Sequence, residues 1–122
     1  MSSLVKEVLS FAAENGYKAF SVEGHDTFGY IVTPDDNIIS VNKGEFGGVT
    51  FSFNYVPSKK NGRGCLCNDR TLYAIPSITE LQAIEAVGRN FAIRLGAEFY
   101  KSSSQWYKEN YWQQHGLLRE VA

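Results

Sequence analysis

The spacing of the apolar residues changes at Pro76, and this change divides the chain into a strand-rich part and a helical part. Before Pro76, apolar and polar residues alternate through residues 48–56, which is the pattern of a strand with one buried face. After it, apolar residues recur at helical spacing through residues 78–95. Strands that are segregated from helices are typical of the α+β class, which we therefore predict.

Turn and capping residues set the expected element boundaries. A first helix is predicted over residues 3–15, capped by Ser3 and ended by Asn15-Gly16. The expected strands are 17–22, 28–33, 37–42, 48–56 and a short edge strand that begins at Cys65. The expected sheet is thus an antiparallel meander of four or five strands.

The helical part is expected to add two C-terminal helices. Ser77 and Glu80 stand at capping-box spacing before a helix over 78–95, which Gly96 ends. A short extended segment follows at 97–101, and Ser103 or Ser104 caps a last helix through Trp112. The N-terminal helix and both C-terminal helices are expected to pack on one face of the sheet.

Two apolar stripes define the expected core. Along the alternating strand, the residues expected to face the helices are Val49, Phe51, Phe53 and Tyr55. Those expected to face water are Thr50, Ser52 and Asn54. Along the helix over 78–95, the expected buried stripe is Leu81, Ile84, Val87, Phe91 and Leu95.

Length and composition indicate one globular domain over residues 1–122, with 43% apolar and 20% charged residues. The net charge of −1 disfavours a surface that is basic throughout, although a local basic patch is compatible with it. Glu7 and Glu14 interrupt the N-terminal apolar residues, unlike a signal peptide. We therefore expect a cytosolic protein, no membrane partner and reduced thiols at Cys65 and Cys67.

A basic, glycine-spaced loop over residues 57–64 is the first candidate site. Its candidate binding residues are Lys59, Lys60, Asn61 and Arg63. They could present charge and backbone N–H groups to a phosphate, or form one edge of a protein contact. They could equally form a solvated hairpin turn, since Asn-Gly is a strong hairpin signal. No structural metal is expected, because the C-x-C pair lacks a second ligand pair.

An aromatic C-terminal segment is the second candidate site. Its candidate binding residues are Tyr100, Trp106, Tyr107, Tyr111 and Trp112. Tyrosine and tryptophan are enriched at protein-binding hot spots. The same rings could instead cover the sheet, or could stack on the bases of a single-stranded nucleic acid.

Catalytic motifs are sparse. His25-Asp26 is the only local pair that resembles a base and its orienting carboxylate, and neither G-x-S-x-G nor H-E-x-x-H occurs. A non-enzymatic protein without a cofactor is therefore favoured over a small hydrolase or transferase centred on His25.

A resemblance to small uncharacterised proteins of tailed bacteriophages covers residues 28–112. It is carried by Phe46-Gly47-Gly48 before the alternating strand, by Tyr55-Val56-Pro57-Ser58 before the basic turn, and by Tyr100-Lys101-Ser102 before the aromatic segment. The resemblance implies a phage or prophage accessory protein that acts in the bacterial host cytoplasm. Such proteins often bind and redirect a host protein.

Three functions are compatible with these patterns. The leading hypothesis is a non-enzymatic accessory protein that binds a host or defence protein through the basic loop and the aromatic segment. The alternative is a nucleotide- or nucleic-acid-binding module that uses Lys59, Lys60 and Arg63. The third is the enzyme centred on His25. Whether the protein is a monomer or a homodimer stays open.

Overall fold

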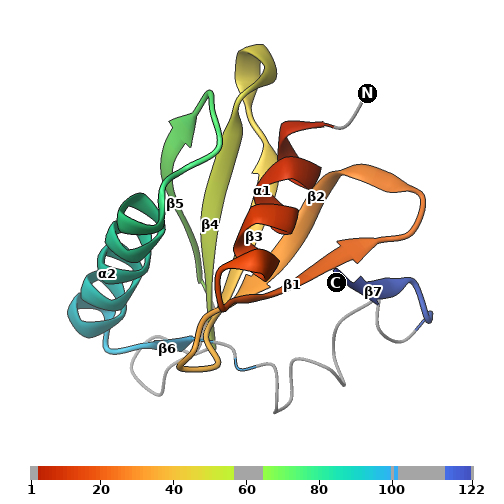
Figure 1. Cartoon of the computed structure of the whole chain (residues 1–122). Coiled ribbons are helices and arrows are strands. Elements are labelled where there is room, and N and C mark those ends of the chain that lie inside the picture. The colour runs from red at the N-terminus through yellow and green to blue at the C-terminus, as the bar shows by residue number, and fades with distance from the viewer. Residues whose placement is uncertain (1–2, 57–64, 100, 102–114, 122) are drawn as a thin grey trace.

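The protein forms one antiparallel sheet with two α-helices on the same face (Figure 1). This computed structural model describes residues 3–56, 65–99, 101 and 115–121, with the backbone alone for Val56 and residues 65–70. The α+β class predicted from the sequence is confirmed.

The sheet has seven strands in the order β5-β4-β3-β2-β1-β7, and β6 also pairs with β4. Their bounds are β1 Lys18–Val22, β2 His25–Val32, β3 Ile38–Lys43, β4 Val49–Val56, β5 Cys65–Leu72, β6 Glu98–Phe99 and β7 Leu118–Glu120. The first five strands are sequential neighbours, as the predicted meander requires.

The predicted strand number, four or five, is wrong. β7 is an additional edge strand beside β1, where Leu118 pairs with Val22. β6 pairs with β4 beyond the start of β3, where Glu98 lies opposite Val56. β5 is also longer than the short edge strand that was predicted, because it follows β4 down to Leu72.

Helix α1 (Leu4–Glu14) begins at the predicted cap. The Ser3 hydroxyl accepts a hydrogen bond from the Lys6 backbone N–H at 3.2 Å, which satisfies one orphan donor of the first turn. Gly29 of β2 lets the helix lie close to the sheet, because an added β-carbon there would lie 2.5 Å from Leu9 Cδ1. The buried side chains of α1 are Val5, Val8, Leu9 and Ala12.

Helix α2 (Ile78–Leu95) begins with the predicted capping box. The Ser77 hydroxyl accepts from the Glu80 N–H, and the Glu80 carboxylate accepts from the Ser77 N–H, each at 3.1 Å. Gly96 ends the helix in the left-handed conformation, at φ 62°. The other predicted C-terminal helix, ending at Trp112, lies outside the described residues.

The buried stripe predicted for α2 is correct at its start and wrong at its end. Leu81 and Ile84 are buried, whereas Leu95 is 39% exposed. The buried residues of the second half of the helix are two small ones, Gly88 and Ala92. The two remaining predicted positions, Val87 and Phe91, are half-buried. Small residues bring this half of α2 close to the aromatic rings below it.

The alternation of β4 is confirmed. Its side chains on the helix side are each at most 1% exposed: Val49, Phe51, Phe53 and Tyr55. On the other side Thr50 and Asn54 are half-buried, but Ser52 is only 3% exposed, so its predicted position in water is wrong. The Ser52 hydroxyl accepts from Asn42 Nδ2 at 3.4 Å, and Asn54 Nδ2 donates to the Ser40 hydroxyl at 2.6 Å. Hydrogen bonds across β3 and β4 thus satisfy polar groups on this face.

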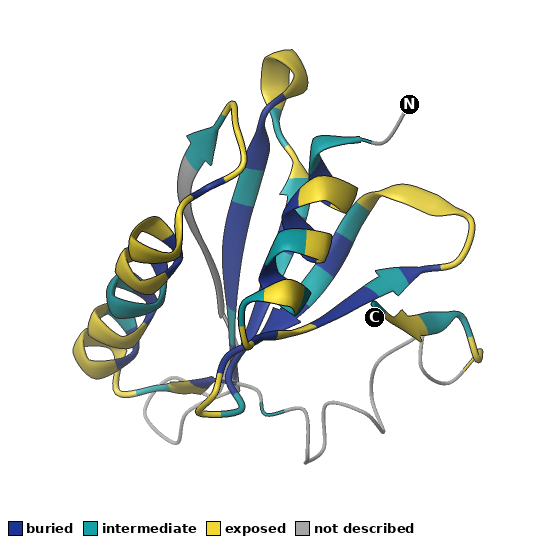
Figure 2. Cartoon of the chain, in the orientation of Figure 1, coloured by how far each residue is buried: buried dark blue, intermediate teal, exposed yellow. Residues whose placement is uncertain are grey.

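A second, smaller apolar cluster lies on the face of the sheet opposite the helices. Phe20, Val32 and Ile38 are buried there and contact the half-buried Tyr30 and Leu118. The register explains the grouping, because Phe20 pairs with Tyr30 and Val32 pairs with Ile38. Burial is therefore high on strands β1 to β3 as well as under the helices (Figure 2).

Replacing Phe51 by alanine tests the orientation of β4. Because Phe51 is fully buried, we expect Phe51→Ala to lower the free energy of unfolding by about 3–5 kcal/mol. Thr50→Ala, on the other face, removes one methyl group and a hydroxyl that lies 3.1 Å from the Thr71 hydroxyl, and it should cost about 1 kcal/mol. Urea unfolding of both variants measures the difference. Equal losses would mean that the assigned faces are wrong.

Candidate functional site

The residues predicted to bind a partner all lie outside the described part of the chain. They are Lys59, Lys60, Asn61, Arg63, Tyr100, Trp106, Tyr107, Tyr111 and Trp112. The described residues that flank them do lie together. Val56, the last residue of β4 before the basic loop, pairs with Glu98. Lys101, which follows Tyr100 in the aromatic segment, pairs with Asn37. Both segments therefore join the described structure at one end of the sheet, which we call the β6 end.

A cavity of about 420 Å³ opens at the β6 end. It lies between the C-terminal half of α2, the segment around β6 and the start of β3. Its lining residues are Asn37, Arg89, Ala92, Ile93, Ala97, Glu98, Phe99 and Lys101. The lining combines an apolar wall with both signs of charge, so the cavity can hold an amphipathic group.

Lys101 is held at this end by the turn between β2 and β3. Its ammonium donates to the Asp35 carbonyl at 3.2 Å and to the Asn37 side-chain oxygen. The turn itself contains Pro34-Asp35-Asp36-Asn37, whose residue types favour tight turns, and Asp36 takes the left-handed conformation at φ 67°. The positive charge of Lys101 is thus held by one backbone carbonyl and one side-chain oxygen of this turn.

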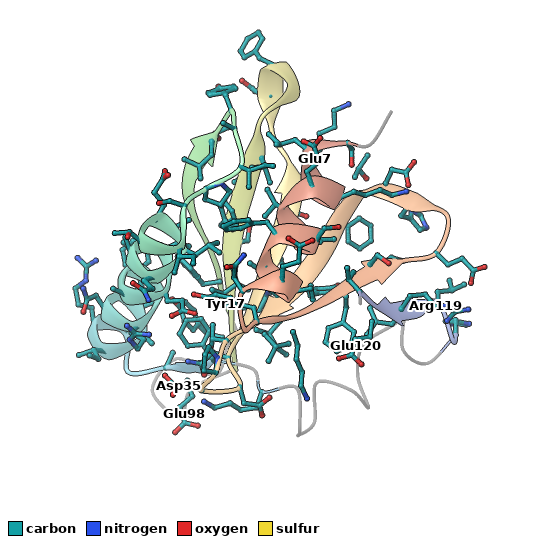
Figure 3. The ribbon with its side chains drawn as sticks, viewed as in Figure 1. Glu7, Tyr17, Asp35, Glu98, Arg119 and Glu120 are labelled. Carbon is teal, nitrogen blue, oxygen red and sulfur yellow. The ribbon has the colours of Figure 1, made fainter. Side chains whose placement is uncertain are left out.

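A cluster of titratable groups lies beside the cavity, between α2 and the residue before β1. Figure 3 labels two of its members, Tyr17 and Asp35. Glu85 of α2 faces the phenol of Tyr17, and its carboxylate lies 3.8 Å from the Arg89 guanidinium. The Glu85 side chain is only 12% exposed, and its Oε1 has no hydrogen-bond partner among the described residues. The contacts with Tyr17 and Arg89 therefore compensate only part of the free-energy cost of burying this charge.

Burial dominates the acid–base properties of this cluster. It raises the pKa of Glu85, while the neighbouring Tyr17 hydroxyl and the Arg89 charge act in the opposite direction. Burial first, and the Glu85 charge second, raise the pKa of Tyr17 to about 12. The negative charge of Asp35 adds to the effect on Glu85. With a pKa of about 12, Tyr17 is a neutral phenol at neutral pH.

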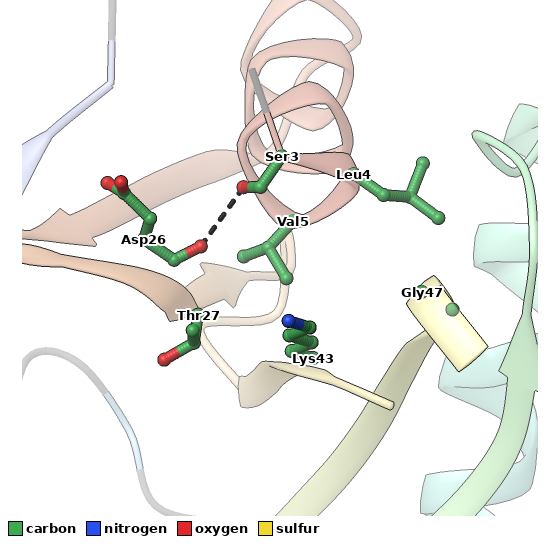
Figure 4. A pocket seen from close by; sticks show the side chains of 8 residues that line it. Ser3, Leu4, Val5, Asp26, Thr27, Lys43 and Gly47 are labelled. Carbon is green, nitrogen blue, oxygen red and sulfur yellow. Dashed lines mark hydrogen bonds between the residues drawn. The ribbon is translucent and has the colours of Figure 1, made fainter. Parts of the chain in front are cut away.

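A groove of about 340 Å³ lies at the opposite end of the molecule, beside the first turn of α1 (Figure 4). The Ser3 hydroxyl donates to the Asp26 carbonyl at 3.0 Å, and the Lys6 ammonium lies 2.9 Å from the Asp26 carboxylate. This contact with Lys6 lowers the pKa of Asp26. Lys43 and Gly47 complete the far side of the groove. These interactions tie the start of α1 to β2.

Phe46 projects from the same end. It lies in the short 3₁₀ turn η1 (Glu45–Gly47), where its backbone is left-handed at φ 55° and its side chain is 89% exposed. A left-handed backbone costs about 1–2 kcal/mol for a residue with a β-carbon, and an exposed ring contributes little burial to offset that cost. Phe46 therefore contributes nothing evident to folding, as is typical of a residue that contacts a partner.

The side chains of Cys65 and Cys67 lie outside the described part of the chain, and His25 forms no metal site with the described residues. Cys65 and Cys67 lie on β5 opposite Tyr55 and Phe53 of β4. No group of three or more histidine, cysteine or acidic residues is placed to hold a metal within the described ranges. The Asp26 carboxylate pairs with Lys6, whereas the His25 ring lies 5.5 Å from the Phe28 ring.

Four residues of the β6 end were not predicted from the sequence as site residues: Asn37, Glu85, Arg89 and Lys101. Glu85 and Arg89 were detectable as a charged pair one helical turn apart. Asn37 and Lys101 are 64 positions apart, and only the pairing of distant strands brings them together. No local pattern identifies such a pair.

Comparisons with known proteins add no assignment. No protein-family model, no curated protein and no solved structure matches this chain. In the part of the chain that the structure describes, neither helix has the length and apolar character needed to cross a membrane.

Replacing Glu85 by glutamine tests the buried carboxylate. Because the pKa of Glu85 is higher in the folded state than in the unfolded state, the destabilising contribution of its charge is greatest above the folded-state pKa. This contribution disappears as the pH falls below the unfolded-state value. We therefore expect Glu85→Gln to raise the free energy of unfolding near pH 7 and to give little gain near pH 4.

The matched control is Glu120→Gln, because Glu120 is exposed on β7. Urea unfolding of both variants and of the wild type, repeated between about pH 4 and about pH 7, measures the pH dependence. A Glu85→Gln variant that is less stable than the wild type at pH 7 would show that the contacts with Tyr17 and Arg89 outweigh the burial.

Replacing Phe46 by asparagine tests whether Phe46 serves the fold. Asparagine tolerates the left-handed conformation better than phenylalanine. We expect Phe46→Asn to leave the free energy of unfolding unchanged or to raise it by up to about 1 kcal/mol. The control is Tyr73→Asn, which removes a ring that is 64% exposed from a residue without positive φ and should bring no gain. A loss of more than about 1 kcal/mol for Phe46→Asn would indicate a structural role.

Proposed function

We propose that this protein is a non-enzymatic binding protein that engages another protein at the β6 end. The pairing of Val56 with Glu98 and of Asn37 with Lys101 carries this proposal. Because of this pairing, the residue before the basic loop lies close to the described residues that border the aromatic segment. Two predicted contact segments, 45 residues apart in the sequence when counted from Val56 to Lys101, can then contribute to one surface.

The partner that we propose is a host or defence protein in the bacterial cytoplasm. The resemblance to small phage proteins motivates this choice, and Phe46 at the opposite end offers a second contact of the same kind. An exposed aromatic ring on a backbone conformation that does not favour it is better explained by binding than by folding.

The alternative, a nucleotide- or nucleic-acid-binding module, is less well supported by the charges at the β6 end. Arg89 and Lys101 lie there, but so do Glu98, Asp35 and Glu85. Mixed charge suits a protein surface, whereas binding of a polyphosphate chain requires an excess of positive charge.

Affinity capture from bacterial lysate, followed by mass spectrometry, tests the proposal. The wild type and a variant in which Lys59, Lys60 and Arg63 are alanine are used as baits, with Phe46→Asn as a third bait. We expect one bacterial protein to be retained by the wild type and less of it by the triple variant. Retention that survives nuclease treatment supports a protein partner, and retention lost with nuclease supports the alternative.

Binding kinetics with the purified partner separate the two predicted contact segments. The triple variant should lower the association rate and keep its stability within about 0.5 kcal/mol per site, because exposed charges steer encounter. Trp106→Ala and Trp112→Ala should instead raise the dissociation rate. Raising the salt concentration should weaken a protein contact far less than a phosphate contact. If the tryptophan variants unfold while the triple variant binds normally, the proposed surface is wrong.

A further inference from the structure

The cavity at the β6 end has the size and composition of a small-ligand site, which goes beyond the proposed protein contact. Its volume of about 420 Å³ falls within the range of about 300–1,000 Å³ that is usual for ligand pockets. Four apolar residues form much of its wall: Ala92, Ile93, Ala97 and Phe99. Ile93 is 77% exposed although it is large and aliphatic, so a ligand could bury it.

Asn37 provides a hydrogen-bond donor at the wall of the cavity. The residue is only 7% exposed, it lines the cavity, and its side-chain oxygen accepts from Lys101. Because an ammonium can only donate, the amide NH₂ group must point elsewhere. No hydrogen bond joins this NH₂ group to a described residue. A ligand that offers an acceptor would satisfy it.

Two cations line the same cavity. Lys101 is held in place by the Asp35 carbonyl and by Asn37. Arg89 is half-exposed, and its contact with Glu85 is long, at 3.8 Å. Amide, ammonium and guanidinium groups are all donors, so the ligand must supply acceptor oxygens.

The charges that line the cavity indicate which kind of anion it can bind. Among the described residues of the lining, Arg89 and Lys101 are the cations and Glu98 is the one acid. The carbonyl end of α2, which carries partial negative charge, lies at the same place. One negative charge on the ligand therefore suits the cavity, and a phosphate dianion does not. We propose that this cavity binds a carboxylate that is attached to an apolar group, with the carboxylate at Asn37 and Arg89 and the apolar group against Ile93 and Phe99.

Such a ligand has two sources: a small organic acid, or the C-terminal residue of a polypeptide with an apolar side chain. Both present the same carboxylate and the same apolar group to the cavity. Glu85 competes for Arg89 in either case, because it is the carboxylate that this guanidinium contacts in the structure. Removing the charge of Glu85 should therefore tighten binding.

The test uses ¹⁵N-labelled full-length protein and 3-phenylpropionate, with 3-phenylpropanamide as the uncharged match and inorganic phosphate as the dianion. We expect 3-phenylpropionate to shift the backbone amides of Arg89, Ile93 and Glu98. The amide compound and phosphate should each bind at least about tenfold more weakly. A short peptide ending in phenylalanine, with its C-terminus free or amidated, identifies the source. Tighter binding of the free peptide than of 3-phenylpropionate would assign the site to a polypeptide C-terminus.

The variants are Arg89→Gln, Ile93→Ser and Glu85→Gln, with Arg94→Gln as the matched control. Arg94 lies on the same helix but over the Phe91 ring, outside the cavity lining. Arg89→Gln should weaken 3-phenylpropionate about tenfold, Ile93→Ser several-fold, and Glu85→Gln should strengthen it. Arg94→Gln should leave binding unchanged.

Four results would overturn the proposal. The first is the absence of binding by both 3-phenylpropionate and the free peptide. The second is binding that shifts only residues of the groove beside α1, such as Thr27 and Gly47. The third is equal binding of the acid and its amide. The fourth is wild-type affinity in Arg89→Gln together with a spectrum that shows this variant to be folded.

Discussion

The close contact between α2 and β4 at Gly88 is the constraint on which the rest of the structure depends. The buried Tyr55 hydroxyl donates to the Gly88 carbonyl at 2.7 Å, so this phenol finds its acceptor on the helix itself. A β-carbon at position 88 would lie 2.7 Å from Phe99 Cζ and 2.8 Å from Phe53 Cδ1. These rings are packed in the core and cannot withdraw as an exposed side chain would. Only glycine allows α2 to lie at this depth.

The short distance between α2 and the sheet determines where the polar groups of the β6 end lie. Glu85 lies one turn before Gly88 and faces Tyr17, Arg89 follows Gly88 directly, and Ala92 lies one turn later on the cavity wall. If α2 lay further from the sheet, Glu85 would be better hydrated and its pKa would fall towards its usual range. The cavity would also lose its wall. The packing of the core and the proposed binding properties thus have one common origin.

Local hydrogen-bond chemistry explains what could be predicted from the sequence. The capping pair Ser77 and Glu80 and the terminal Gly96 define α2 without reference to the rest of the chain, and both were predicted. Strand β7 was not, because three residues at Leu118–Glu120 carry no periodic pattern and become a strand only by pairing with β1. The same limit applies to the candidate site. Asn37 and Lys101 meet only because β6 returns to β4 beside the start of β3.

Urea unfolding of Gly88→Ala tests this account most directly, because two effects of opposite sign compete at this position. In an unobstructed helix, alanine is more favourable than glycine by about 0.8–1 kcal/mol. The contacts of Gly88 with Phe53 and Phe99 predict the reverse, since either the rings or the helix must move. Asn90→Ala, at an exposed position of the same helix, provides the control and should be slightly stabilising. The account predicts a lower free energy of unfolding for Gly88→Ala, whereas an increase of about 1 kcal/mol would contradict it.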